Sequence, residues 1–216
     1  MIYAENILIC IATPLLFSLL FVKGWTRLFV ITFLTGMVMC LLSGYINGFV
    51  SFAGTMSEND VSIFVSPITE EIMKIFPILF VMLLFDFTDT VVVSGAIGVG
   101  VGFATFENIC YLLSFGVNKI VFILIRGMAV GVMHIMSVVV VTVALLIAKR
   151  FHCLSLPGIM GALALSMTFH ALYNLLVSEP GINAYVGYTL PVLTTVAVLY
   201  VSSRYRNVIF EDEKDR

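Results

Sequence analysis

The chain has 216 residues, of which 61% are hydrophobic and 11% are charged, and its formal net charge at pH 7 is -2. So high an apolar content excludes an ordinary soluble domain and indicates an integral membrane protein. The near-neutral charge and the lack of a basic run argue against nucleic acid as a partner. The sequence has no internal repeat and no soluble domain, so residues 1–216 are expected to form a single transmembrane domain.

Apolar stretches long enough to cross a bilayer follow one another along the chain. A helix rises ~1.5 Å per residue, so about 20 apolar residues cross a hydrocarbon core of ~30 Å. We therefore expect an all-α, polytopic integral membrane helical bundle. Its seven expected transmembrane helices are Ile7 to Val22, Leu28 to Val50, Pro67 to Phe85, Thr90 to Ser114, Ile120 to Ala148, Leu156 to Val177 and Ile182 to Val201.

The basic residues outside these spans indicate the orientation. Lys and Arg in short loops are retained on the cytoplasmic side, which predicts the N-terminus outside and the C-terminus in the cytoplasm. The first span has no positive segment before it, and we expect it to stay in the mature protein. Lys119 is the one basic residue expected outside, and the cytoplasmic set is Lys23, Arg27, Lys149, Arg150, Arg204, Arg206, Lys214 and Arg216.

The third span begins with the charged sequence "SPITEEIMK". Ser66 followed by Pro67 predicts a helix start with a side-chain cap and a proline in the first turn. Glu70 and Lys74 are four residues apart and so share one face of the helix. Glu71 points about 100° away from Glu70, which predicts different roles for the two acids.

Other polar residues are expected at the same depth, in the outer half of the membrane. Ionisable groups in the hydrocarbon region are costly, so a functional site is the first hypothesis for each. Lys74 and Arg126 are expected to be charge partners of the acids, and His134 alone suits a structural hydrogen bond equally well. The set is completed by Glu107 in the fourth span, Arg126 and His134 in the fifth, and His170 and Asn174 in the sixth.

Two glycine pairs predict close helix contacts beside these residues. Gly98 and Gly102 in the fourth span, and Gly127 and Gly131 in the fifth, have the spacing that lets a neighbouring backbone approach. Such contacts would hold the polar side chains in fixed positions.

Acids, histidines and an amide around one chamber suit hydrolysis by an activated water. A carboxylate can act as the general base while His and Asn stabilise the oxyanion. Alternatively, glutamates and histidines can bind a divalent metal such as zinc. A proton- or cation-coupled transporter using the same cluster is the alternative function, although repeated halves and midplane sites are typical of that class.

The ordered motifs resemble those of a known family. Glu-Glu-x-x-Lys at 70–74, Phe-x-x-x-Glu at 103–107, His134, and His-x-x-x-Asn at 170–174 are similar to the PrsW family of intramembrane proteases. That family is grouped with CAAX prenyl proteases and bacteriocin-processing enzymes. The resemblance covers about residues 66–177, the expected catalytic core. It implies a multi-pass protein of a bacterial plasma membrane that cleaves a single-pass anti-sigma factor at site 1, on the extracytoplasmic side, in a stress response.

The resemblance also implies roles for single residues. Glu70 and Glu71 would be the catalytic pair, Glu107 and His170 would complete the site, and Asn174 would donate to the oxyanion. Some relatives carry an acid where this chain has Asn174, so an oxyanion role suits the amide better than metal ligation does. Lys74, Arg126 and His134 would support them.

The cofactor is unknown at this stage. Lys74 and Arg126 beside the acids oppose a dication, which favours glutamate-activated water. If zinc is bound, the expected ligands are Glu71, Glu107, His134 and His170.

Overall fold

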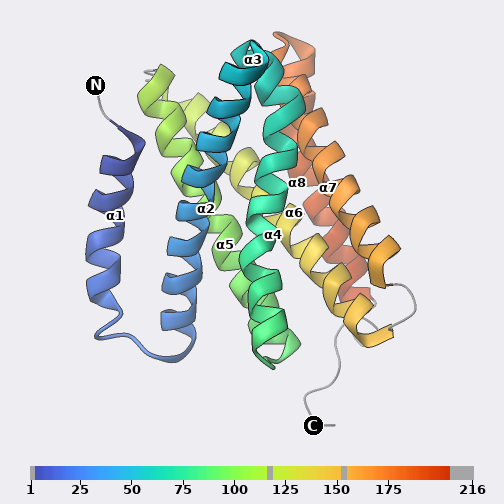
Figure 1. Ribbon diagram of the computed structural model, residues 1–216. Coiled ribbons are helices and arrows are strands. Elements are labelled where there is room, and N and C mark those ends of the chain that lie inside the picture. The colour runs from blue at the N-terminus through green and yellow to red at the C-terminus, as the bar shows by residue number, and fades with distance from the viewer. Residues whose placement is uncertain (1–2, 116–118, 152–154, 205–216) are drawn as a thin grey trace.

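The computed structural model describes residues 3–115, 119–151 and 155–204. These residues form helices and turns without any strand, so the predicted all-α class is confirmed (Figure 1). Arg206, Lys214 and Arg216, used above for the orientation, lie outside the described ranges. The elements are α1 (Ala4–Ser18), α2 (Gly24–Gly54), α3 (Glu58–Asp60), the π-helical turn η1 (Val61–Val65), α4 (Ser66–Leu84), α5 (Asp89–Phe115), α6 (Ile120–Phe151), α7 (Ser155–Ser178) and α8 (Ile182–Arg204).

Five of these helices, α2, α5, α6, α7 and α8, are long and apolar enough to cross a membrane. The chain is therefore a multi-pass membrane protein, and its many exposed Leu, Ile and Phe side chains face the lipid bilayer. The first helix has 15 residues and is shorter than expected, because the chain turns after Ser18. α4 has 19 residues but carries three charges. That all seven long helices cross the bilayer stays a prediction.

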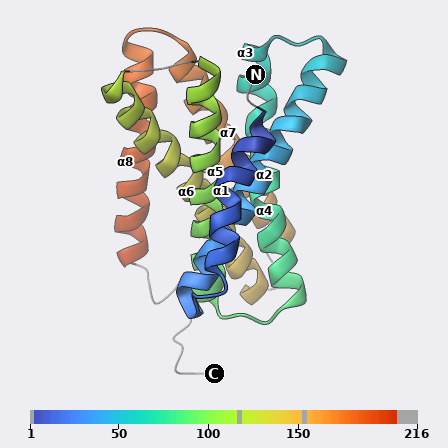
Figure 2. The same ribbon diagram turned by 90° about the vertical axis from the view of Figure 1, so that its left-hand side faces the viewer.

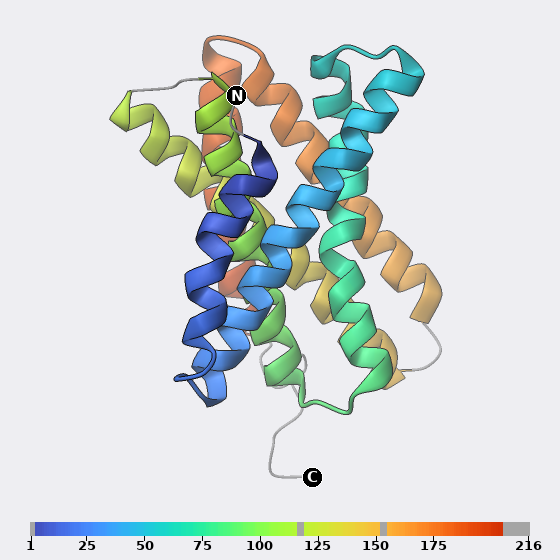
Figure 3. The same ribbon diagram turned by 60° about the vertical axis from the view of Figure 1, so that its left-hand side comes forward.

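The two central helices are α5 and α6. In an apolar 18-residue stretch of each helix, 56% is buried in α5 and 50% in α6, against 11% in α8. α1 packs against α2 at one edge (Figure 3), and α8 packs against α6 and α7. Figure 2 shows α8 and α4 at opposite edges of the bundle. Polar side chains on α5, α6 and the inner faces of α4 and α7 are consequently enclosed by other helices.

The first glycine pair makes the contact that its spacing predicts. A Cβ on Gly98 would overlap the Thr32 hydroxyl of α2, and a Cβ on Gly102 would overlap the Phe33 carbonyl oxygen. Only glycine permits α2 and α5 to lie this close. The prediction for Gly127 and Gly131 is wrong.

A Cβ at Gly127 or at Gly131 would meet open space, because these positions of α6 face away from its neighbours. The contact between α5 and α6 depends on Gly100 instead. A Cβ there would lie 2.8 Å from Ile135 Cα and 3.1 Å from the His134 carbonyl oxygen. Gly100 thus sets the distance between α5 and the backbone that carries His134.

The start of α4 also differs from the prediction. Pro67 does lie in the first turn, but Ser66 does not cap the helix. The turn η1 runs directly into α4, so the Ser66 amide donates to the Val61 carbonyl oxygen. The Ser66 hydroxyl accepts a hydrogen bond of 2.9 Å from Asn47 of α2. A continuous helical chain therefore leads from the end of the bundle into the two glutamates.

Candidate active site

Glu71 and Lys74 form a closed, buried network between α4, α6 and α7. Both side chains are fully buried and their charged atoms are 2.6 Å apart. Lys74 Nζ also donates to Ser137 Oγ at 2.8 Å and lies 3.0 Å from His134 Nδ1. Three donors directed at acceptors leave the ammonium group of Lys74 fully satisfied.

The carboxylate of Glu71 is satisfied as well. Oε1 accepts from Lys74 and contacts His170 Nδ1 at 2.9 Å, while Oε2 accepts from Ser166 Oγ at 2.8 Å. A carboxylate bonded to one ring nitrogen fixes the orientation of the imidazole and leaves its other nitrogen for a ligand. Glu71 therefore positions His170 and has no free oxygen of its own.

Glu107 is held on the other side of the chamber. Its Oε1 accepts from Arg126 at 3.2 Å, and its Oε2 lies 2.5 Å from His134 Nε2. The Arg126 guanidinium stacks 3.5 Å from the centre of the Tyr111 ring. The side chain of Glu107 is 29% exposed, so this carboxylate is fixed but reachable.

His134 bridges the two networks. Lys74 can only donate, so His134 Nδ1 accepts and the ring proton lies on Nε2, directed at Glu107. The ring is fully buried and packs against Phe103 with centroids 5.0 Å apart. This arrangement holds the ring rigidly.

Glu70 is the exception among the acids. Its side chain is 12% exposed, and its Oε2 has no hydrogen-bond partner among the described residues. The nearest ionisable group to that atom is His170 Nε2, at 3.7 Å. A buried carboxylate oxygen without a donor is costly. It indicates a ligand that the chain itself does not supply.

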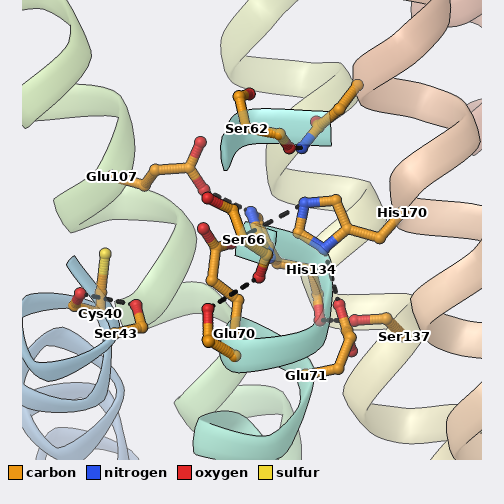
Figure 4. Close-up of polar contacts among 12 residues, drawn as sticks. Cys40, Ser43, Ser62, Ser66, Glu70, Glu71, Glu107, His134, Ser137 and His170 are labelled. Atoms are coloured by element: carbon orange, nitrogen blue, oxygen red, sulfur yellow. Dashed lines mark hydrogen bonds and ion pairs between the residues drawn. The ribbon is translucent and has the colours of Figure 1, made fainter. Parts of the chain in front are cut away.

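A metal cation fits this position. Glu70, His134 and His170 each offer one ligand atom, and these atoms lie within 4.8 Å of one another. Two imidazoles and a carboxylate are a frequent donor set for zinc. The two rings are perpendicular with centroids 5.1 Å apart, and Figure 4 shows Glu70, Glu107, His134 and His170 directed into one space.

The ligand set differs from the one expected from the sequence. The candidate set has Glu70 with the two histidines, whereas Glu71 is saturated and Glu107 contacts His134 Nε2. The charges that spoke against a dication are also neutralised, because Lys74 pairs with Glu71 and Arg126 with Glu107. The third carboxylate, Glu70, has no Lys or Arg paired with it among the described residues, which leaves it available to a metal ion.

Asn174, expected to donate to the oxyanion, makes another contact. Its amide donates to the Ser62 carbonyl oxygen at 2.8 Å and so ties α7 to η1. Two residues were missed by the sequence interpretation, Ser137 and Ser166. Each lies one helical turn from a site histidine on the same face, and that spacing was the available signal.

A polar crevice opens beside the start of α4. Its volume is about 460 Å³, and it lies between the end of α2 and the segment formed by α3 and η1. Ser66, one turn before Glu70, forms part of its wall. The lining residues also include Asn47, Gly48, Ser51, Glu58 and Ser62. The crevice therefore lies one helical turn from Glu70.

Comparison with known proteins identifies the family. A family model described as PrsW family intramembrane metalloprotease matches residues 24–202, which is most of the chain. No curated protein and no solved structure matches the chain.

Proposed function

Since the chain belongs to the PrsW family of intramembrane metalloproteases, we propose that it is a metal-dependent endopeptidase that cleaves a single-pass membrane protein near the membrane surface. The observation that carries this proposal is the buried, unpartnered carboxylate oxygen of Glu70 beside two histidine rings. Family membership favours peptide hydrolysis over the transporter hypothesis.

Glu70, His134 and His170 would hold the metal. Because His134 Nδ1 accepts from Lys74, its Nε2 would be the ligand atom, and that nitrogen would first have to lose the proton directed at Glu107. A bound zinc ion would polarise the peptide carbonyl group and make a nearby water more acidic. Glu71 holds His170 through its Nδ1 nitrogen. Lys74 in turn holds both Glu71 and His134. The closed network thus orients both histidines before the substrate arrives.

Glu107 is the proposed general base. It lies next to His134, is partly exposed, and is kept ionised and oriented by Arg126. It takes a proton from water as the new bond forms between the water oxygen and the peptide carbon. The proton then passes to the peptide nitrogen as the C–N bond breaks, which leaves a free acid and a free amine.

The site is proposed to open on the extracytoplasmic side. Lys23 and Arg27 near the α1–α2 turn, and Lys149 and Arg150 at the end of α6, lie at the end of the bundle opposite α3 (Figure 1). By the positive-inside rule this end is cytoplasmic. The start of α4 then faces outward, which supports site-1 cleavage of an anti-sigma factor as the specific reaction.

The test uses purified protein in detergent with a single-pass anti-sigma factor as substrate. We expect the wild type to cleave near the outer membrane surface and Glu70→Gln and His170→Ala to lose cleavage by at least ~10³-fold. Glu179→Gln, an exposed acid in the turn between α7 and α8 at the same end of the bundle (Figure 1), is the matched control. A chelator should abolish cleavage and added zinc should restore it. Full activity of Glu70→Gln, or activity unaffected by the chelator, would contradict the metal site.

A further inference from the structure

Tyr173 is a buried residue of the chamber wall that the proposed mechanism does not yet use. It lies on α7 three residues after His170, so both side chains are on one face of the helix. Its exposure is 2%, and its hydroxyl has no hydrogen-bond partner among the described residues. A phenylalanine would fill the same volume without leaving a buried polar group unsatisfied, so packing does not explain the hydroxyl.

The position of Tyr173 relates it to the site. Helical side chains lean towards the N-terminal end of their helix, so Tyr173 leans back towards the level of His170. Its ring packs with Met133, the residue before His134. The same cluster includes Ala129 and Val130, so the ring covers the part of α6 between Arg126 and His134. The hydroxyl is therefore on the side of α7 that faces the proposed base.

Arg126, which holds Glu107, has a second buried donor without an acceptor. Arg126 Nε is buried without an acceptor, although Nη2 of the same guanidinium bonds to Glu107. Asn174, the amide next in sequence to Tyr173, is already bonded to η1. The Tyr173 hydroxyl and Arg126 Nε are thus two buried donors that have no acceptor oxygen among the described residues. Arg126 also holds Glu107, the proposed base.

We propose that the Tyr173 hydroxyl donates a hydrogen bond to the carbonyl oxygen of the scissile peptide bond, as a catalytic residue of the proposed proteolysis on which this inference rests. When the water oxygen bonds to the carbonyl carbon, the π electron pair moves to the carbonyl oxygen and makes it negative. Tyr173 keeps its proton and stabilises that oxygen. The electron pair returns as the C–N bond breaks, so the tyrosine is unchanged after each turnover.

The test compares Tyr173→Phe with Tyr188→Phe in the same cleavage assay. Tyr188 is the matched control, because its ring packs edge-on against Tyr173 at 6.4 Å between centroids but it lies on α8, in the wall of an apolar crevice. Removal of one oxyanion donor lowers kcat by about 10²–10³-fold. We expect this loss for Tyr173→Phe alone, with KM, zinc content and thermal stability unchanged.

Three results would overturn the inference. Wild-type kcat in Tyr173→Phe would mean that the hydroxyl does not touch the reacting atoms. A loss of kcat accompanied by loss of zinc or of stability would assign it a structural role. Failure of the wild type to cleave would refute the proposed function first and this inference with it, whereas an active wild type with an active Tyr173→Phe refutes the inference alone.

Discussion

Two adjacent glutamates at the start of α4 have opposite surroundings. Glu71 is fully buried, and both of its oxygens accept hydrogen bonds from Lys74, His170 and Ser166. Glu70 is nearly as buried, yet one of its oxygens has no donor. Two residues adjacent in the helix thus differ: Glu71 has all its hydrogen bonds made within the chain, and Glu70 has an oxygen available to a ligand. Burial of an acid therefore does not by itself indicate a catalytic role, and the completeness of its hydrogen bonds distinguishes the two cases.

The comparison predicts unequal effects on the free energy of unfolding when charge is removed beside Glu71 and at Glu70. Lys74→Met leaves the Glu71 carboxylate buried without its cation, and we expect a loss of ~3–5 kcal/mol in the free energy of unfolding. Glu70→Gln removes an unpaired charge and should change stability by less than ~1 kcal/mol. Reversible unfolding in mixed micelles measures both. The double variant Glu71→Gln, Lys74→Met should recover much of the loss, since no lone charge remains, and equal losses for Lys74→Met and Glu70→Gln would remove the distinction.

Substitution of Arg126 tests whether Glu107 is the general base or has a structural role like that of Glu71. If Glu107 is the base, Arg126→Gln should lower kcat by about 10²-fold, because the carboxylate loses its fixed position. Arg126→Lys keeps the charge but not the planar group that stacks on Tyr111, so an intermediate kcat is expected. Steady-state cleavage kinetics with zinc content measured in parallel test this. An unchanged kcat in Arg126→Gln would mean that Glu107, like Glu71, has a structural role.

The different surroundings of the two glutamates were predictable from the sequence, but which acid has which surroundings was not. Charges in an apolar helix stand out because the bilayer penalises them, and the helical angle between neighbours predicts that they face different ways. Which acid is saturated depends on Ser166 and His170, contributed by α7, which is distant in the sequence. The expected ligand set therefore contained Glu71 and lacked Glu70.

The same limit explains the glycine pairs and Asn174. Spacing predicts that Gly102 and Gly131 both lie on small faces of their helices, but it does not say whether a face meets a helix or lipid. In the bundle, Gly102 meets α2 and Gly131 meets open space. Asn174 was assigned from its motif, while its actual partner is a backbone carbonyl of a π-helical turn that the sequence did not predict.

A substitution at Gly100 should reduce both the stability of the bundle and the cleavage activity. Gly100→Ala forces α5 away from the backbone of His134, which separates Glu107 from the histidine that contacts both networks. We expect a loss of ~1–3 kcal/mol together with reduced cleavage. Gly131→Ala is the matched control on α6, and it should be neutral or stabilising because alanine is the better helix former. Equal effects of the two variants would show that the α5–α6 contact does not set the site.

The smallest expected effect concerns the access of substrate to Glu70 through the polar crevice. Gly48→Trp places an indole group at the wall of the polar crevice near Ser66, and the added Cβ has no atom within 4 Å. KM should rise about threefold, which corresponds to ~0.65 kcal/mol of binding free energy, while stability stays constant. Gly44→Trp, one turn away on α2 and equally unhindered, should leave KM unchanged. A KM raised equally by both substitutions would mean that the crevice is not the approach to Glu70.

The central claim, that Glu70 is a ligand and Glu71 a positioning residue, is tested most directly by zinc titration of the purified wild type, Glu70→Gln and Glu71→Gln in detergent. The account predicts one zinc per wild-type chain and a zinc affinity at least ~10³-fold weaker in Glu70→Gln. For Glu71→Gln it predicts a stoichiometric site with affinity reduced about 10–100-fold, the usual effect of losing a carboxylate that supports a ligating histidine. Wild-type zinc affinity in Glu70→Gln, with loss of binding in Glu71→Gln, would contradict the claim.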